Sequence, residues 1–288
     1  MGAFLETRSY SPELEANIFY CFNNNFLAHY HIDVEMVYVC EGSILIGVNK
    51  ETKVLNKGEM AIFSSTDIHY YDSENRSSSI VVLIFRPDIV GCPAGWPENA
   101  NFASAFIDSS IMNKLDNSVK MKLRSIFYEI SEEFRSERPF FEQYIKGKII
   151  ELSSLCLRHF PTCNKTLTDK PKKIPDIPKI QYIIDYIEKN YNSDLDLKTI
   201  SNIANLSPYY FSRLFKKFTG LTFKKYLTII RIDKAQKLIK STPKSMLDIS
   251  MDCGYNCVRT FNRDFKKVKG YAPTKEKWLY PMSEGSVH

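Results

Sequence analysis

The chain of 288 residues lacks a long hydrophobic run. No stretch reaches the roughly 18 consecutive apolar residues of a membrane-spanning helix, and Met1–Glu6 has neither the basic nor the apolar region of a secretory leader. Seven cysteines, an odd number, are scattered without metal-binding pairs, which indicates reduced thiols. We therefore expect a cytoplasmic protein without a membrane partner.

Catalytic motifs are also missing. The 11 glycines form no loop that would cradle a phosphate, and no nucleophile stands at a recognisable spacing from a general base. We therefore expect that the protein is not an enzyme and that it binds no cofactor.

Charge is distributed unevenly along the chain. Residues 176–288 carry 20 Lys and Arg against 11 Asp and Glu, whereas residues 1–160 carry 15 against 21. The C-terminal part is therefore basic, as expected of a domain that neutralises the phosphates of double-stranded DNA.

A ten-residue pattern occurs twice in this basic part. Residues 211–220 read FSRLFKKFTG and residues 261–270 read FNRDFKKVKG, with identity at six positions. Two aromatic residues four apart, lysines in the last turn and a closing glycine predict a helix. A short apolar segment and a residue that tolerates positive φ, Asn205 or Gly254, precede each copy. Each copy therefore predicts a helix-turn-helix.

The segment between the copies predicts a connecting helix. Apolar residues recur at helical spacing from Phe223 to about Lys240, and Pro243 follows. Such a helix would be about 27 Å long. It would hold two recognition helices about 34 Å apart, the distance between successive major grooves on one face of B-DNA.

Residues 176–280 resemble the DNA-binding domain of the AraC/XylS family of bacterial transcription regulators. The resemblance rests on the paired pattern and on Gly270-Tyr271-Ala272-Pro273 after the second copy. The family usually has Tyr-Arg shortly after this proline, and here the chain reads Thr274–Trp278 instead. The resemblance implies sequence-specific binding of double-stranded DNA.

Helix geometry separates buried from DNA-facing positions. The paired phenylalanines of each copy should face inward, which turns the arginines toward the groove. Arginine can pair with guanine, asparagine suits adenine, and lysines are better suited to phosphate. We expect base contacts from Tyr209, Ser212, Arg213, Val258, Arg259, Asn262 and Arg263, and phosphate contacts from Lys216, Lys217, Lys266 and Lys267.

Residues 1–112 alternate short β-branched and aromatic segments with turn residues. This spacing favours an antiparallel sandwich or jelly roll, and we expect a small β-barrel. The whole chain is then an α+β multidomain protein: a barrel, a helical hairpin and an all-α domain with two helix-turn-helix motifs.

The barrel segment carries a polar constellation. His29, His31, Glu35 and Gly42 have the spacing of the first cupin motif, and His69 falls in the second. This segment resembles the cupin-like sensor domains of AraC-type regulators, in which such residues line a pocket for a small, often sugar-like effector. The resemblance implies effector contacts from His29, His31, Glu35, Tyr38 and His69, with Arg86 as an additional candidate.

Two other roles for these residues stay open, a structural one and a metal site. Three imidazoles and a carboxylate can bind a divalent transition metal. However, Ser64, Thr66 and Ser73 replace the usual residues of the second cupin motif. We therefore assign no metal ligands.

Two apolar stripes at helical spacing in residues 113–160 predict a helical hairpin, interrupted at Arg138-Pro139. We expect the hairpin to cover the barrel and to make the contact between two subunits of a homodimer, as the resemblance to the AraC/XylS family implies. The alternative is that the hairpin packs only within the monomer. Residues 161–175, rich in proline and lysine, predict an extended linker to the DNA-binding domain of residues 176–288.

These features predict a transcription regulator controlled by a small-molecule effector, for which a carbohydrate is one candidate. The alternative from another class is a cupin-type metalloenzyme fused to a DNA-targeting module. A third hypothesis is constitutive DNA binding with a purely structural barrel.

Overall fold

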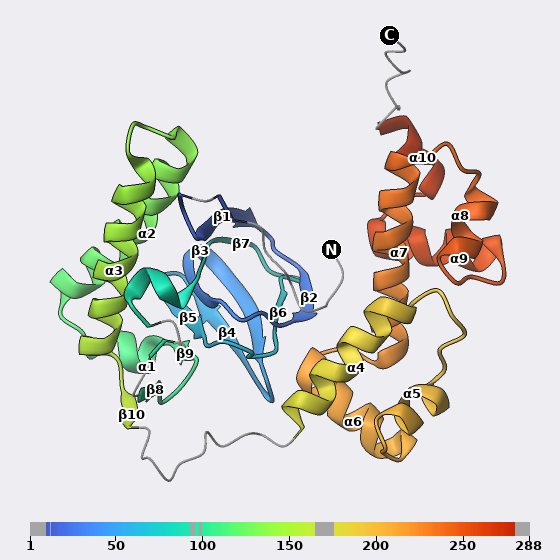
Figure 1. Ribbon diagram of the computed structural model, residues 1–288, viewed down its shortest axis with the longest axis horizontal. Coiled ribbons are helices and arrows are strands. Elements are labelled where there is room, and N and C mark those ends of the chain that lie inside the picture. The colour runs from blue at the N-terminus through green and yellow to red at the C-terminus, as the bar shows by residue number, and fades with distance from the viewer. Residues whose placement is uncertain (1–9, 12, 93–95, 98–99, 165–175, 280–288) are drawn as a thin grey trace. The chain divides into compact units, whose positions relative to one another are not determined.

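The computed structural model describes residues 10–11, 13–92, 96–97, 100–164 and 176–279. The chain divides into two compact units, with the division after Ile177 (Figure 1). Among the described helices, none combines the length and the apolar character needed to cross a bilayer.

The first unit contains an antiparallel sheet of eight strands. Five of them follow the order β1-β7-β3-β5-β9, while β4 and β6 pair with the far half of β3, and β2 pairs with β6. The strands are β1 (Ala16–Phe22), β2 (Phe26–His29), β3 (Val34–Val48), β4 (Glu51–Asn56), β5 (Met60–Phe63), β6 (His69–Asp72), β7 (Ser78–Phe85) and β9 (Phe106–Ile107).

The long strand β3 bends in the middle and belongs to both halves of this sheet. Its register with β7 shifts between Val39 and Glu41, and Gly42 follows with φ of 70°. A Cβ on Gly42 would lie 1.8 Å from the Ser77 carbonyl oxygen, so the bend requires glycine. The shift also exchanges the two faces of the strand. Before the bend, the odd-numbered Val37 and Val39 face one core. After the bend, even-numbered residues such as Ile44 face the same core.

The predicted barrel does not close. Within the described residues, β1 pairs with β7 and β9 pairs with β5, and no strand connects these two edges. Since one strand supplies both halves, the sheet folds over on itself and buries its core between the halves. The strand-rich unit is therefore an open, folded sheet and not a closed barrel.

The predicted helical hairpin is present as α2 (Asn117–Ser136) and α3 (Phe141–His159). Helix α2 packs on the outer face of the sheet, where Leu123 and Phe127 share a core with Met36 and Leu83, and α3 packs against α2 (Figure 1). The apolar stripes that motivated the dimer prediction thus lie mostly inside the unit. Two short helices, η1 (Pro87–Val90) and α1 (Ser109–Met112), precede the hairpin.

The first residues of the predicted linker form a strand instead. β10 (Thr162–Asn164) pairs antiparallel with β8 (Ala100–Phe102), which extends the first unit beyond the hairpin. The rest of the predicted linker, residues 165–175, lies outside the described residues.

The second unit is entirely helical in its described part. Polar N-caps start several helices: the side chains of Asp196, Ser207, Thr222 and Ser245 each accept a hydrogen bond from an amide of the first turn. The helices are α4 (Ile177–Asn190), α5 (Leu197–Ile203), α6 (Pro208–Thr219), α7 (Phe223–Ser241), α8 (Met246–Asp252), α9 (Val258–Lys269) and α10 (Pro273–Leu279).

Candidate DNA-binding surface and buried histidine site

Both predicted helix-turn-helix motifs are present. The first consists of α5 and α6, and the second of α8 and α9. The turn residue has φ of 52° at Asn205 and 79° at Gly254, as the sequence predicted. Glycine closes each recognition helix, with Gly220 and Gly270 both in the left-handed conformation.

The phenylalanines of the repeat hold each recognition helix by one face. Phe211 and Phe215 are fully buried, and the Phe215 ring meets Tyr226 of α7 edge-on, with 5.1 Å between ring centroids. Phe261 and Phe265 are likewise fully buried in a core shared with α7 and α8. The opposite face of each helix is therefore left to carry polar groups.

None of the eleven predicted DNA-contacting side chains is buried. Val258 is half-buried because it packs partly against the second core, and Ser212 is also half-buried. DNA contact by these residues stays a prediction. The exposed ones are Tyr209, Arg213, Lys216, Lys217, Arg259, Asn262, Arg263, Lys266 and Lys267.

Two of the predicted base-reading arginines have partners within their own helix. The Arg213 guanidinium lies 5.7 Å from the centroid of the Tyr209 ring, and Arg263 Nε lies 3.2 Å from Asp264 Oδ1. A neighbour that restrains an arginine lowers the entropy lost when the arginine pairs with a base. Tyr210 is not among the predicted contacts, although it is 48% exposed beside Tyr209. Its place in the first turn of the recognition helix was the available signal.

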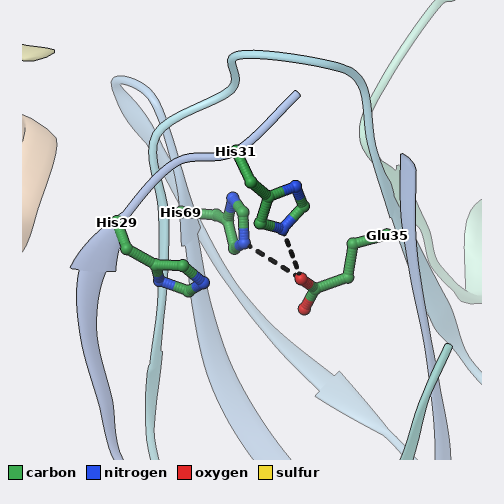
Figure 2. Close-up of side chains that lie close together, drawn as sticks. All are labelled: His29, His31, Glu35 and His69. Atoms are coloured by element: carbon green, nitrogen blue, oxygen red, sulfur yellow. Dashed lines mark hydrogen bonds and ion pairs between the residues drawn. The ribbon is translucent and has the colours of Figure 1, made fainter. Parts of the chain in front are cut away.

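The first unit brings four of the five predicted effector residues together. His29 ends β2, His69 begins β6 opposite it, Glu35 lies on β3, and His31 lies between β2 and β3 (Figure 2). Their ligand atoms all lie within 4.8 Å of one another, and each residue is at most 2% exposed. Alternation on the strands and the pairing of β2 with β6 produce this convergence.

Backbone carbonyls fix how each imidazole is oriented. Nδ1 of His29, His31 and His69 lies 2.9, 3.0 and 2.9 Å from the carbonyl oxygens of Leu27, Asp33 and Asp67. Since a carbonyl can only accept, Nδ1 must carry the proton in all three rings. In the neutral form, each Nε2 then carries a lone pair.

The carboxylate of Glu35 is the centre of the cluster. Oε2 lies 2.8 Å from His31 Nε2 and 3.3 Å from His69 Nε2, and the Tyr71 hydroxyl donates to Oε1 (Figure 2 shows the two histidine contacts). A lone pair on Nε2 would repel this carboxylate. The contacts are therefore favourable when a proton or a metal ion lies between Nε2 and the carboxylate.

Burial and charge act in opposite directions on these groups. Burial, followed by the neighbouring His69, holds the pKa of His29 well below its ordinary value. Burial alone would raise the pKa of Glu35, but the charge of His69 and the hydrogen bond from His31 hold that pKa well below its ordinary value. Glu35 is thus an ionised carboxylate in an enclosed site.

Tyr38 does not join the cluster, which corrects the sequence prediction. It lies three residues after Glu35 and so faces the other side of β3. There its ring stacks on Phe127 of α2, with centroids 5.1 Å apart and 18° between the ring planes. Arg86 also lies elsewhere, since its Nη1 is 2.9 Å from Glu15 Oε1 at the surface.

Three aromatic residues of the site were missed. Tyr71 is two residues after His69 on β6, so strand alternation was the signal for it. The Phe63 ring stacks on His69 with centroids 4.4 Å apart, and Phe26 meets His29 edge-on at 4.5 Å. These rings exclude water from the histidines and provide apolar surface beside them.

The residues present fit a divalent transition metal. Three imidazole nitrogens and a carboxylate are a common ligand set for such ions. Metal-bound histidines usually donate their other ring N–H to a carbonyl or carboxylate, as all three do here.

Comparison with known proteins supports both halves of this description. The family description "Helix-turn-helix domain" matches residues 200–277, and "Cupin domain" matches residues 23–85. The chain is 30% identical over 149 residues to the bifunctional transcriptional activator/DNA repair enzyme AdaA of Bacillus subtilis. These residues are 48% of this chain and 70% of that protein.

Two further relatives were found. The melibiose operon regulatory protein of Escherichia coli K12 is 21% identical over 266 residues, which covers 88% of this chain and 83% of the relative. A crystal structure of a transcriptional regulator with an AraC-type DNA-binding domain, from Chromobacterium violaceum, is 24% identical with a TM-score of 0.35 and covers 38% of this chain and 98% of that one.

Proposed function

The chain belongs to the AraC family of transcription regulators, and on this premise we propose that a small-molecule effector bound in its N-terminal unit controls its binding to specific DNA sequences. The observation that carries the proposal is the buried cluster of His29, His31, Glu35 and His69, which lies in a different unit from the two helix-turn-helix motifs. Histidines and a carboxylate packed so closely are costly to bury, so a purely structural role is the weaker explanation. We infer that the protein binds its effector and DNA and catalyses no reaction. We also infer that it acts in the cytoplasm.

A carbohydrate is the effector class that we propose. A relative named for the melibiose operon covers most of the chain, which supports a sugar. Polar groups beside the rings of Phe26, Phe63 and Tyr71 suit a hydroxylated ligand, because hydroxyls need hydrogen-bonding partners and the apolar face of a sugar stacks on rings.

A sugar panel that includes melibiose tests this proposal. The full chain is assayed for thermal stability and for affinity to a duplex selected from random DNA. We expect one sugar to raise the melting temperature and to change the Kd for DNA about fivefold or more. The response should be lost in His29→Ala and kept in Lys57→Ala, which alters an exposed side chain. DNA binding with no response to any sugar would support the constitutive regulator instead.

We also propose that the protein acts as a homodimer through the outer face of the α2–α3 hairpin. The stripe buried in the monomer is not available to a partner, but another set of apolar side chains is exposed. Ile150 and Leu157 of α3 are 48% and 41% exposed, and their spacing of seven places them on one face of the helix. Tyr144 and Met121 are 44% and 66% exposed on the same hairpin. Apolar surface at this spacing favours a helix of a second copy.

A second candidate function, a cupin-type metalloenzyme fused to a DNA-targeting module, is favoured by one observation. All three histidines donate Nδ1–H to backbone carbonyls and so aim Nε2 at one point. His29, His31, Glu35 and His69 would hold the ion. When bound, such an ion acts as a Lewis acid toward an oxygen of a ligand.

Element analysis of the purified protein distinguishes the candidates. A metalloenzyme requires about one equivalent of iron, manganese or zinc, lost in His31→Ala. If removal of this ion by a chelator leaves DNA affinity unchanged, the ion serves a separate activity; if DNA affinity changes, the ion belongs to the sensor. A protein without stoichiometric metal supports effector binding by the side chains alone.

A further inference from the structure

We propose that Arg231 and Gly254 lock the two helix-turn-helix motifs together and so determine which spacing between two DNA half-sites the protein accepts. The inference rests on the proposed function in one respect, namely that both recognition helices read DNA. It concerns residues outside the recognition helices, none of which faces the DNA in that reading.

Arg231 connects three segments that are far apart in the chain. It lies on α7, the helix between the two motifs. Its Nε donates to the Tyr191 carbonyl at 2.8 Å, and Nη2 donates to the Ser193 carbonyl at 2.9 Å, just after α4. Its guanidinium carbon also lies 5.6 Å from the centroid of the Tyr255 ring. Tyr255 lies in the turn of the second motif, so one side chain links that turn to the end of α4.

The link continues into the second recognition helix. Tyr255 is 5% exposed, and its ring meets Phe261 of α9 edge-on with centroids 5.4 Å apart. Phe261 is the fully buried phenylalanine that fixes which face of α9 is exposed. A shift of Arg231 would therefore be transmitted through two packed rings to the helix that carries Arg259 and Arg263.

Gly254 allows the direct backbone contact on which this link depends. A Cβ at Gly254 would lie 2.8 Å from both the Cα and the carbonyl oxygen of Asn192. The equivalent turn residue of the first motif is Asn205, with φ of 52°. Positive φ alone is therefore compatible with asparagine, and the close approach of residue 192 is the feature that demands glycine in the second motif.

A second ion pair holds the end of α4 to the same helix. Lys234, three residues after Arg231, lies 2.5 Å from Glu188 Oε1 and 5.4 Å from the centroid of the Tyr191 ring. Two basic side chains of α7, those of Arg231 and Lys234, thus contact the segment of residues 191–193. Gly254 approaches this segment at Asn192, and the Tyr255 ring packs on Arg231 beside it.

This arrangement constrains the angle between the motifs. Helix α7 sets the distance between them, while the contact of residue 192 with the second turn restricts how α8 and α9 rotate about α7. One added base pair moves a half-site by about 3.4 Å and turns it by about 35°. A rigid pair of recognition helices cannot follow such a rotation. The protein should therefore bind best to DNA with one particular spacing between the half-sites.

The test uses the full chain and duplexes built from half-sites selected from random DNA by the parent protein. The spacer is shortened or lengthened by one base pair, and Kd is measured for each spacing and for each half-site alone. Gly254→Asn breaks the contact but keeps a residue that tolerates positive φ. Gly270→Asn is the matched control, because Gly270 has φ of 82° and, among the described residues, nothing within 4 Å of its Cβ position. Arg231→Met removes the hydrogen bonds and the charge, whereas Arg231→Lys keeps the charge.

We expect the parent and Gly270→Asn to prefer one spacing by about tenfold or more. In Gly254→Asn and Arg231→Met this preference should fall to about twofold, with affinity for either half-site alone within about threefold of the parent. Arg231→Lys should be intermediate, and it decides the question if the other two variants do not fold. Retained spacing preference in a folded variant, or an equal loss of affinity for all duplexes, would overturn the proposal. A parent that selects no DNA sequence would instead refute DNA reading by the two motifs.

Discussion

The hydroxyl of Tyr71 donates a hydrogen bond to Oε1 of Glu35, inside a cluster where both residues are buried. Tyr71→Phe removes the donor and keeps the ring, which leaves one carboxylate oxygen less well satisfied. We expect a loss of about 1 to 3 kcal/mol in the free energy of unfolding of the first unit. Urea titration followed by circular dichroism measures this loss.

Tyr255→Phe is the control for this prediction. Within the part of the chain that the structure describes, the Tyr255 hydroxyl is buried without a hydrogen-bond partner, so its removal should be neutral or slightly stabilising. If Tyr71→Phe leaves the unfolding of the first unit unchanged, the Tyr71–Glu35 hydrogen bond does not stabilise that unit.

Dimerisation is predicted to depend on exposed, not buried, residues of the hairpin. Ile150→Lys combined with Leu157→Lys should convert a dimer to a monomer without loss of helix content, since both side chains are exposed. Leu123→Ala, at a fully buried position, should instead cost about 2 to 5 kcal/mol of stability. Sedimentation velocity at micromolar concentration gives the oligomeric state. A parent that sediments as a monomer, or a double variant that remains dimeric, contradicts this interface.

Arg213 and Lys216 are predicted to act differently although both are exposed on α6. Arg213→Ala should cost about 1 to 3 kcal/mol on the best DNA site and relax the preference at one base pair. Lys216→Ala should weaken binding to all sequences about equally and lower the salt dependence by about one counterion. Binding-site selection with each variant measures both effects. An unchanged sequence preference in Arg213→Ala would make Arg213 a phosphate contact.

Cys257 is predicted to be the thiol that reacts at the lowest pH among those whose pKa is shifted. It is the exposed N-cap of α9, where the nearby backbone N–H groups of Thr260 and Arg259 lower its pKa. Burial raises the pKa of Cys253 to about 11. Since a lowered pKa exposes the thiolate at lower pH, iodoacetamide should label Cys257 below the pH at which an ordinary thiol reacts.

Mass spectrometry of the labelled cysteines across a pH series measures this order. Bound DNA should slow the labelling of Cys257, because Val258 and Arg259 adjoin it in the predicted interface. Earlier labelling of Cys253, or labelling of Cys257 that DNA leaves unchanged, would contradict the orientation of α9.

The C-terminal unit was largely predictable because its signals are local. Phenylalanines four apart, lysines in the last turn and a closing glycine act within a single helix, and the repeat doubled the signal. The histidine cluster was predictable in part, because side chains alternate between the two faces of a strand. His29 and His31 share a parity, and the cupin spacing placed Glu35 and His69 beside them.

What failed depends mainly on contacts distant in sequence. Tyr38 is the exception, because it has the opposite parity to Glu35 and strand alternation by itself excludes it from the site. Glu41-Gly42 predicts a turn between two strands, whereas the structure has a bend within the single strand β3, and this bend depends on the carbonyl of Ser77. Likewise, an apolar stripe such as that of Leu123 and Phe127 does not say whether a sheet or a second subunit covers it. For this reason the barrel and the dimer surface were the least secure predictions.

Selection of binding sites from random duplex DNA by the full chain tests the central claim most directly. Two recognition helices held on one α7 predict a bipartite sequence preference, with half-sites about one turn of B-DNA, or roughly 10 to 10.5 base pairs, apart. Binding to the selected duplex should weaken steeply as salt rises, since exposed lysines and arginines neutralise phosphates. Selection of a single short half-site, or of no sequence at all, would contradict DNA reading by two coupled motifs.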